Sequence, residues 1–430
     1  MKIKIEPSHL KLGMYVSELD RPWTESPFIF QGFELRTVEE IEDIQEICQY
    51  VYVNTEKSAK SVHAQLKNIH KSPQSKTNKK NKTNKKNKTD DTTKTKHSGI
   101  SKSSTKVEHD VINKDIHKAS ITRNKTRAYV DDMLAEARMG KIIDTKTAKS
   151  LVAKMANNII ENTDASMWLT NLKKRDEYTA IHSVNVCVLS LTFGRALGLN
   201  KEQLNELGLG ALLHDLGKMH TPLEILNKPG KLTDDEFKIM KTHPVQGYQT
   251  LEASSDLSPD VLDIVKSHHE RLSGSGYPAG LKEDEIKYFT KIVSITDVYD
   301  AVTSDRVYHD GMTPHQALKN MYEWAPGNFD LKLIQEFIRT IGIYPVGSVV
   351  ELKTGHIGIV IKLNKQQRLK PILIMIMNRH KEYYAKRKLV NLASSIWDTK
   401  ENKPEINRII DAKEYDIDVT SIIQEESFST

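Results

Sequence analysis

The sequence LLHDLGKM at residues 212–219 carries most of the information in this 430-residue chain. Neighbouring side chains on a helix diverge by about 100°, so His214 could bind one metal ion while the two oxygens of Asp215 bridge that ion to a second. Imidazole and carboxylate ligands without sulfur suit Fe or Mn, and also Ni or Zn. The pair therefore predicts a dinuclear metal centre in a helical domain.

Further histidines and one more aspartate complete a ligand set around this pair. The histidines lie in helical patterns or at helix ends, and the predicted metal ligands are His182, His214, Asp215, His243, His268, His269 and Asp297. Two ions about 3.5–4 Å apart can hold a bridging hydroxide and neutralise phosphoryl oxygens during in-line displacement. We therefore expect two divalent metal ions, a catalytic role for Asp215, and hydrolysis of a phosphate ester by the metal-bound hydroxide.

Two basic side chains are candidates for contacting the phosphate. Lys218 lies about one helical turn after His214, where its charge would stabilise the transition state, so we assign it catalytic and substrate-binding roles. Arg306 follows Asp297 by nine residues and could bind a second phosphate oxygen through two hydrogen bonds. A lone internal histidine is more often structural than a ligand, but the combination of these residues in one domain favours the metal site.

A lysine-rich segment separates the two ends of the chain. Twelve lysines and two aspartates between Lys71 and Lys106 sum to +10, and because the net charge of the chain is +6, the remaining residues carry about −4. The segment holds too few apolar side chains to offset the entropy of ordering. We predict a flexible linker over residues 61–106, and no nucleic-acid partner, because aromatic residues are not interleaved with the lysines.

Hydrophobic periodicity predicts a mainly helical chain with small β-containing parts at both ends. Residues 1–60 combine short alternating runs with one helical stretch and form a small α+β domain with a regulatory role. Residues 107–342 form the helical domain, and cap signals occur at Asp144, Asp164 and Thr233. Residues 343–430 form a short β-rich appendage and a weakly structured tail. Its expected strands are residues 349–352, 358–363 and 372–377.

The cysteine and hydropathy patterns indicate a cytoplasmic protein. Cys48 and Cys187 are the only cysteines and lack CxxC spacing, which argues against a disulfide framework or a thiolate zinc site. The chain does not open on a secretion signal, and it has no run of about 18 apolar residues. We therefore expect no membrane partner.

The motifs that surround these residues resemble the HD-GYP family of bacterial cyclic-dinucleotide phosphodiesterases. The matching segments are DEYT at 176–179, HSVNV at 182–186, LLHDLGK at 212–218, KPGKLT at 228–233, HHER at 268–271, GSGYP at 274–278, DVYDA at 297–301 and TSDR at 303–306. The resemblance implies an HD-type helical phosphohydrolase fold and the same seven metal ligands. The N-terminal segment resembles a domain of unknown function that often precedes HD-GYP domains.

The resemblance also implies contacts to the substrate. Lys218, Arg306 and Asp176 match family positions near the substrate. The Gly276-Tyr277-Pro278 loop resembles a substrate-side loop that also recognises protein partners. Tyr178 stands where some members have a glutamate that binds a third metal ion, so we predict two ions. Ser273 and His309 also depart from the family pattern, and they bear on loop contacts and on substrate preference.

The implied function is a metal-dependent phosphodiesterase that hydrolyses cyclic di-GMP to linear pGpG. Two alternatives stay open: hydrolysis of the mixed 3′,3′-cyclic GMP-AMP dinucleotide, and a non-catalytic sensor or adaptor that binds a cyclic dinucleotide. Whether hydrolysis continues to GMP, which metal is bound, and the oligomeric state stay open as well, with a homodimer as one option.

Overall fold

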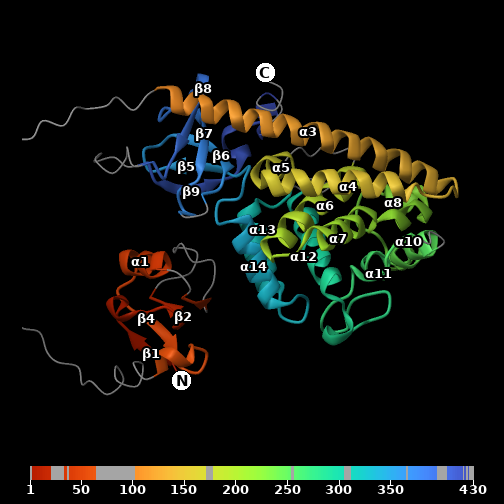
Figure 1. Cartoon of the computed structure of the whole chain (residues 1–430), viewed down its shortest axis with the longest axis horizontal. Coiled ribbons are helices and arrows are strands. Elements are labelled where there is room, and N and C mark those ends of the chain that lie inside the picture. The colour runs from red at the N-terminus through yellow and green to blue at the C-terminus, as the bar shows by residue number, and fades with distance from the viewer. Residues whose placement is uncertain are drawn as a thin grey trace, which may run out of the picture. The chain divides into compact units, whose positions relative to one another are not determined.

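The computed structural model describes residues 2–20, 33–35, 38–63, 102–170, 178–252, 256–304, 311–364, 367–394, 404–419, 421–422 and 425. The chain divides into two compact units, Met1–Ser101 and Lys102–Thr430, and each is described by itself (Figure 1). Asp176, Arg306, His309 and residues 64–101 of the predicted linker lie outside the described residues.

The N-terminal unit is a small α+β fold built on a four-stranded antiparallel sheet of order β1-β4-β2-β3. Its elements are β1 (Lys2–Ile5), η1 (Pro7–His9), β2 (Tyr15–Leu19), β3 (Phe33–Glu34), α1 (Val38–Ile47), β4 (Val51–Asn54) and η3 (Lys60–Val62). Alternate residues of β1 and β4 are buried, as expected when one sheet face is covered. Val16 and Val53 of the sheet and Ile44 of α1 are fully buried in one core.

A helical domain makes up most of the second unit, which confirms the predicted mainly α fold. Its elements are α3 (Lys102–Arg138), α4 (Thr145–Glu161), α5 (Thr163–Leu169), α6 (Tyr178–Ala196), α7 (Lys201–Leu213), η4 (Leu216–His220), α8 (Leu223–Leu226), α9 (Asp234–Met240), α10 (His243–Glu252), α11 (Pro259–Ser267), η5 (Glu283–Glu285), α12 (Tyr288–Thr303), α13 (Pro314–Trp324) and α14 (Leu331–Ile341). Helix α3 lies along α4 (Figure 1), and it begins five residues before the expected start of the helical domain at residue 107.

Helix α6 forms the centre of this domain. All its residues from Ala180 to Gly194 are buried, and it contacts α3, α4, α7, α12 and α14. A helix that is apolar on all sides is stable only when neighbours surround it. The ring of Phe193 packs edge-on against that of Phe337 in α14, with 5.2 Å between ring centroids. His182 therefore lies in a buried interior, where a polar side chain needs partners.

Local capping chemistry sets the starts of several helices. The side chain of Asp144 caps α4, and Thr233 with Glu236 forms a capping box at α9, as predicted. The prediction of a cap at Asp164 is wrong, because Asn162 caps α5 and Asp164 lies in its first turn. Asn162 has the extended backbone that an N-cap residue adopts.

The C-terminal part of the second unit is a five-stranded antiparallel sheet of order β8-β7-β6-β5-β9. Its elements are β5 (Val349–Leu352), β6 (Ile357–Lys362), β7 (Ile372–Met377), β8 (Tyr383–Asn391), β9 (Ile406–Ile410) and η7 (Ala412–Tyr415). The first three strands confirm the expected strands. The edge strands β8 and β9 fall in the expected weakly structured tail and correct that expectation. Charged residues such as Lys386 are tolerated in β8 because one side of an edge strand is unpaired.

Candidate metal centre

The predicted metal ligands come together at the ends of several helices. His182 lies in α6 and Asp297 in α12, whereas the others flank helix termini. In the described part of the chain, three overlapping groups have ligand atoms within 4.8 Å of one another: Asp215, His243, His268 and His269; His182, His214 and Asp215; His214, His268 and Asp297. All seven predicted ligands therefore belong to one cluster.

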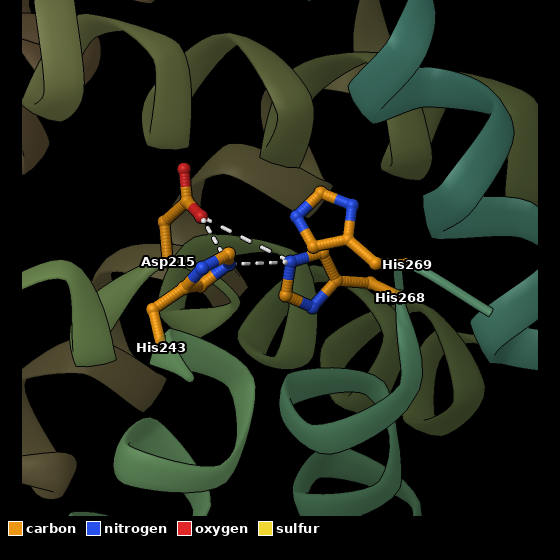
Figure 2. A group of neighbouring side chains, drawn as sticks. All are labelled: Asp215, His243, His268 and His269. Atoms are coloured by element: carbon orange, nitrogen blue, oxygen red, sulfur yellow. Dashed lines mark hydrogen bonds and ion pairs between the residues drawn. The ribbon is translucent and has the colours of Figure 1, made fainter. Parts of the chain in front are cut away.

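The carboxylate of Asp215 has histidines on two sides. Its Oδ2 atom lies 3.3 Å from Nε2 of His214 and 3.6 Å from Nε2 of His182. Its Oδ1 atom lies 3.3 Å from Nε2 of His243 and 3.9 Å from Nε2 of His268. Figure 2 shows one oxygen of Asp215 directed at His243 and His268, with His269 beside them. A carboxylate that bridges two ions requires this two-sided arrangement.

Backbone carbonyls orient three of the imidazoles. The Nδ1 atoms of His214, His243 and His268 lie 2.7, 2.7 and 3.0 Å from the carbonyl oxygen three residues earlier. Because a carbonyl only accepts hydrogen bonds, each Nδ1 carries the proton and donates it. Each Nε2 lone pair is then left to face the centre, which is the usual way in which a protein orients a metal-binding histidine.

Asp297 contributes a second buried carboxylate to the cluster. Its Oδ1 atom lies 3.1 Å from Nε2 of His182 and 3.9 Å from Nε2 of His214. Its Oδ2 atom lies 3.9 Å from Nδ1 of His269. Like Asp215, Asp297 therefore faces His182 and His214 with one oxygen and a histidine of the other group, His269, with the other oxygen.

Two buried ligand atoms have no hydrogen-bond partner among the residues that the structure describes. They are Nε2 of His214 and Oδ1 of Asp215, in side chains that are 0% and 1% exposed. Leaving a buried polar atom unsatisfied costs about 1–3 kcal/mol, and a cation would supply the partner that both atoms lack. The orphaned atoms and the nitrogen and oxygen donors around them fit divalent metal ions.

Burial and neighbouring charges set the protonation states of the ligands. Burial, together with nearby histidines, lowers the pKa of His268 to about 3. Burial opposes ionisation of Asp215, but the charge of Lys218 beside it holds its pKa well below the usual range. Burial also disfavours the charged form of His182, but hydrogen bonds to two buried carboxylates raise its pKa to about 9. A neutral imidazole and an ionised carboxylate are the forms that bind metals. His268 and Asp215 already have these forms, whereas His182 would release a proton when an ion binds.

Lys218 is the predicted substrate residue that the structure places at the centre. Its Nζ atom lies 2.5 Å from Oδ2 of Asp215, and its side chain is 20% exposed. The ammonium group therefore lies where the buried cluster approaches solvent. Asp176 and Arg306, the other predicted substrate contacts, lie outside the described residues.

Asp300 is a further residue of the site, to which the sequence analysis assigned no role. Its Oδ2 atom lies 2.7 Å from Nδ1 of His182, and its Oδ1 atom accepts a hydrogen bond of 3.2 Å from Asn185. Both spacings are visible in the sequence, because Asp300 follows Asp297 and Asn185 follows His182 by three residues. Residues three apart share a helix face, so Asp300 on the helix of Asp297 and Asn185 on the helix of His182 can form a chain of hydrogen bonds behind His182.

Two glycines let the short helix η4 approach α10. A Cβ atom added at Gly217 would lie 1.9 Å from the carbonyl oxygen of His243 and 2.4 Å from the amide nitrogen of Gly247. Any side chain at residue 217 would therefore push the backbones apart. The glycine of the LLHDLGKM motif thus brings His243 within reach of Asp215.

The loop that follows His268 and His269 is tied back to the centre. The buried carboxylate of Glu270 accepts hydrogen bonds from the amides of residues 279–281 at 2.7–3.2 Å. A Cβ atom added at Gly276 would lie 2.5 Å from Cα of Glu270, so the close approach requires glycine. The ring of Tyr277 then lies 4.7 Å from that of His269 at an interplanar angle of 30°.

Within the described ranges, no helix combines the length and the apolar composition needed to cross a membrane.

Comparisons with known proteins show what this chain is similar to. A family model described as an HD domain matches residues 154–333, and one described as a domain of unknown function (DUF3391) matches residues 2–148. The chain is 33% identical over 395 residues to the cyclic di-GMP phosphodiesterase PA4108 of Pseudomonas aeruginosa, covering 92% of this chain and 88% of that protein. It is 36% identical over 181 residues to the 3′3′-cGAMP-specific phosphodiesterase 1 of Vibrio cholerae, covering 42% of each. Among solved structures, Bd1817 of Bdellovibrio bacteriovorus, an HDG"Y"P protein, covers 78% of this chain and 98% of its own at 19% identity, with a TM-score of 0.45.

Proposed function

This chain belongs to the HD-domain family that includes the cyclic di-GMP phosphodiesterase PA4108, and we propose that it is a metal-dependent phosphodiesterase that hydrolyses cyclic di-GMP to linear pGpG. The observation that carries the proposal is the position of Asp215. Its two oxygens face two different pairs of histidines, at 3.3–3.6 Å on one side and 3.3–3.9 Å on the other. A site for a single ion would not need histidines on both sides of this carboxylate.

We assign the seven ligands to two ions, with iron or manganese as the first candidates. His182 and His214 would hold one ion, and His243, His268 and His269 the other. Asp215 would bridge them, and Asp297 faces both groups. When bound, the ions would supply an activated water molecule and would neutralise charge on the phosphate. The backbone-anchored imidazoles keep the ligands in place, so little reorganisation is needed when the ions bind.

Lys218 would act on the substrate directly. Its ammonium group lies beside Asp215 at the exposed edge of the cluster, where it can bind a phosphate oxygen and stabilise the charge that develops during displacement. Asp176 and Arg306 stay predicted substrate contacts on the strength of their positions in the family motifs.

Several further expectations belong to this proposal. We place the enzyme in the cytoplasm, because its two cysteines lie far apart in the sequence without CxxC spacing, as is typical of a reducing compartment. Recognition of a protein partner by the loop at residues 276–278, a homodimer, and the absence of nucleic-acid and membrane partners stay predictions. The boundaries of the domains at residues 1–60, 61–106, 107–342 and 343–430 stay predictions as well.

The test is a parallel assay of two substrates. The full chain, loaded with Mn²⁺ or Fe²⁺, is incubated with cyclic di-GMP and with 3′,3′-cyclic GMP-AMP, and the products are separated by chromatography. We expect pGpG to appear first, and GMP at later times if hydrolysis continues. Faster turnover of cyclic GMP-AMP would favour the alternative substrate, which one relative hydrolyses specifically. Binding without cleavage over hours would indicate a non-catalytic sensor.

Asp215→Asn provides the control for this assay. The substitution keeps the side-chain volume but removes the charge that faces both histidine pairs. It should abolish product formation while the helical domain stays folded. Undiminished turnover in Asp215→Asn would refute the proposed centre.

A further inference from the structure

Helix α9 carries large apolar side chains that the fold does not bury. None of its residues is buried, and the side chains of Phe237 and Ile239 are 46% and 42% exposed. The helix is nonetheless held in place by its capping box and by hydrogen bonds from Lys228 to Glu236. Exposed apolar side chains at a fixed position often mark a binding surface.

Phe237 is the outer member of a row of rings that begins at the metal centre. The ring of Tyr277 lies against His269, 4.7 Å between centroids, and the ring of Phe237 lies 6.4 Å from that of Tyr277, nearly perpendicular to it at 80°. The Nζ atom of Lys241 lies 5.1 Å from the centroid of Phe237 and 5.9 Å from that of Tyr277. A half-exposed aromatic surface with one positive charge is thus continuous with the site of the reaction.

We propose that Phe237, Tyr277 and Lys241, here called the aromatic platform, bind one nucleobase of the cyclic dinucleotide. This inference rests on the proposed function. When a phosphate of the ring occupies the metal centre, the attached nucleoside must extend away from the buried histidines. The aromatic platform is an apolar surface that adjoins those histidines through Tyr277. Lys241 adds a positive charge that complements an anionic ligand.

The platform contributes affinity and not the choice between bases. Every nucleobase has a π-face, so stacking on aromatic side chains tolerates different bases. Removing the ring of Phe237 should therefore weaken the binding of cyclic di-GMP and of cyclic GMP-AMP by similar factors. Preference between the two substrates must then come from hydrogen bonds made elsewhere.

The experiment compares steady-state kinetics of the full, metal-loaded chain and four variants on both substrates. Phe237→Ala and Phe237→Leu should raise KM about 5- to 150-fold, because the loss of one stacked base costs about 1–3 kcal/mol. The value of kcat should change by less than about twofold, because stacking binds ground state and transition state alike. Phe237→Trp should keep a KM close to that of the wild type. Ile239→Ala is the matched control, since it removes a similarly exposed apolar side chain from the same helix, and its KM should not change.

Three results would overturn the platform: a KM for Phe237→Ala within about twofold of wild type, a wild-type KM for Phe237→Leu, or an equal rise in KM for Ile239→Ala. The third result would point to a protein or other large partner on α9. Equilibrium binding of cyclic di-GMP to Asp215→Asn, with and without Phe237→Ala, tests the platform even if the wild type cleaves neither substrate. A failure of the platform and a failure of the proposed function are therefore distinguishable.

Discussion

Replacing Asp300 should weaken the binding of one metal ion and leave the affinity for the other unchanged. Asp300 holds Nδ1 of His182 at 2.7 Å, and both side chains are only 2% exposed. His182 belongs to the group with His214 and Asp215. His243, His268 and His269 form another group with Asp215, so the ion that these three histidines would hold should keep its affinity.

The size of the effect follows from the geometry. A short, buried hydrogen bond to a charged group contributes about 1.5–3 kcal/mol. Loss of such a partner behind a metal-binding histidine weakens metal affinity about 10- to 100-fold, which equals about 1.4–2.7 kcal/mol. The loss of affinity in Asp300→Ala should lie at the upper end of this range. Asp300→Asn should lie at the lower end, because its amide oxygen can still accept from Nδ1 of His182.

Isothermal titration of metal-free protein with Mn²⁺ measures the two affinities, and thermal denaturation of the metal-free protein measures the fold. Ser190→Ala is the matched control, because the 2.7 Å hydrogen bond between Ser190 and Thr296 also joins α6 to α12 in the buried core. Neither residue belongs to the groups of predicted ligands. Ser190→Ala should lower stability without changing metal affinity. The reasoning is refuted if Asp300→Ala leaves both affinities unchanged, lowers both equally, or behaves as Ser190→Ala does.

Four further outcomes are expected. Gly217→Ala should lower the free energy of unfolding by about 3 kcal/mol or more in denaturant titration, because the added Cβ atom would lie 1.9 Å from the carbonyl oxygen of His243; a stable variant would contradict the close approach. Lys218→Met should reduce kcat about 10²- to 10³-fold with metal content unchanged, and an unaltered kcat would remove Lys218 from the mechanism. Glu270→Gln should speed hydrogen exchange of the amides at residues 279–281, which its carboxylate now binds; equal exchange rates would argue against this anchor. A chelator should lower the melting temperature, since an ion at 100 times its Kd contributes about 2.7 kcal/mol, and an unchanged melting temperature would exclude a resident metal.

Local chemistry made much of the fold predictable. The capping signals at Asp144 and Thr233 act within four residues, so a short window of sequence contains everything they need. The apolar runs of β5, β6 and β7 likewise identify buried strands by composition alone. The same reasoning failed for β8, because an edge strand makes few demands on its side chains. It also failed at Asp164, because the nearby Asn162 is the residue that caps α5.

The sequence by itself determined which residues could form the centre. The seven predicted ligands and Lys218 all occur in short motifs that can be recognised along the chain. Only the tertiary structure decided how they face one another. Which oxygen of Asp215 meets which histidines, the support of His182 by Asp300, and the path of rings from His269 to Phe237 depend on contacts between helices far apart in sequence. Those contacts are set by the packing of α6, α7, α10 and α12, and spacing along one chain does not encode the angle between two helices.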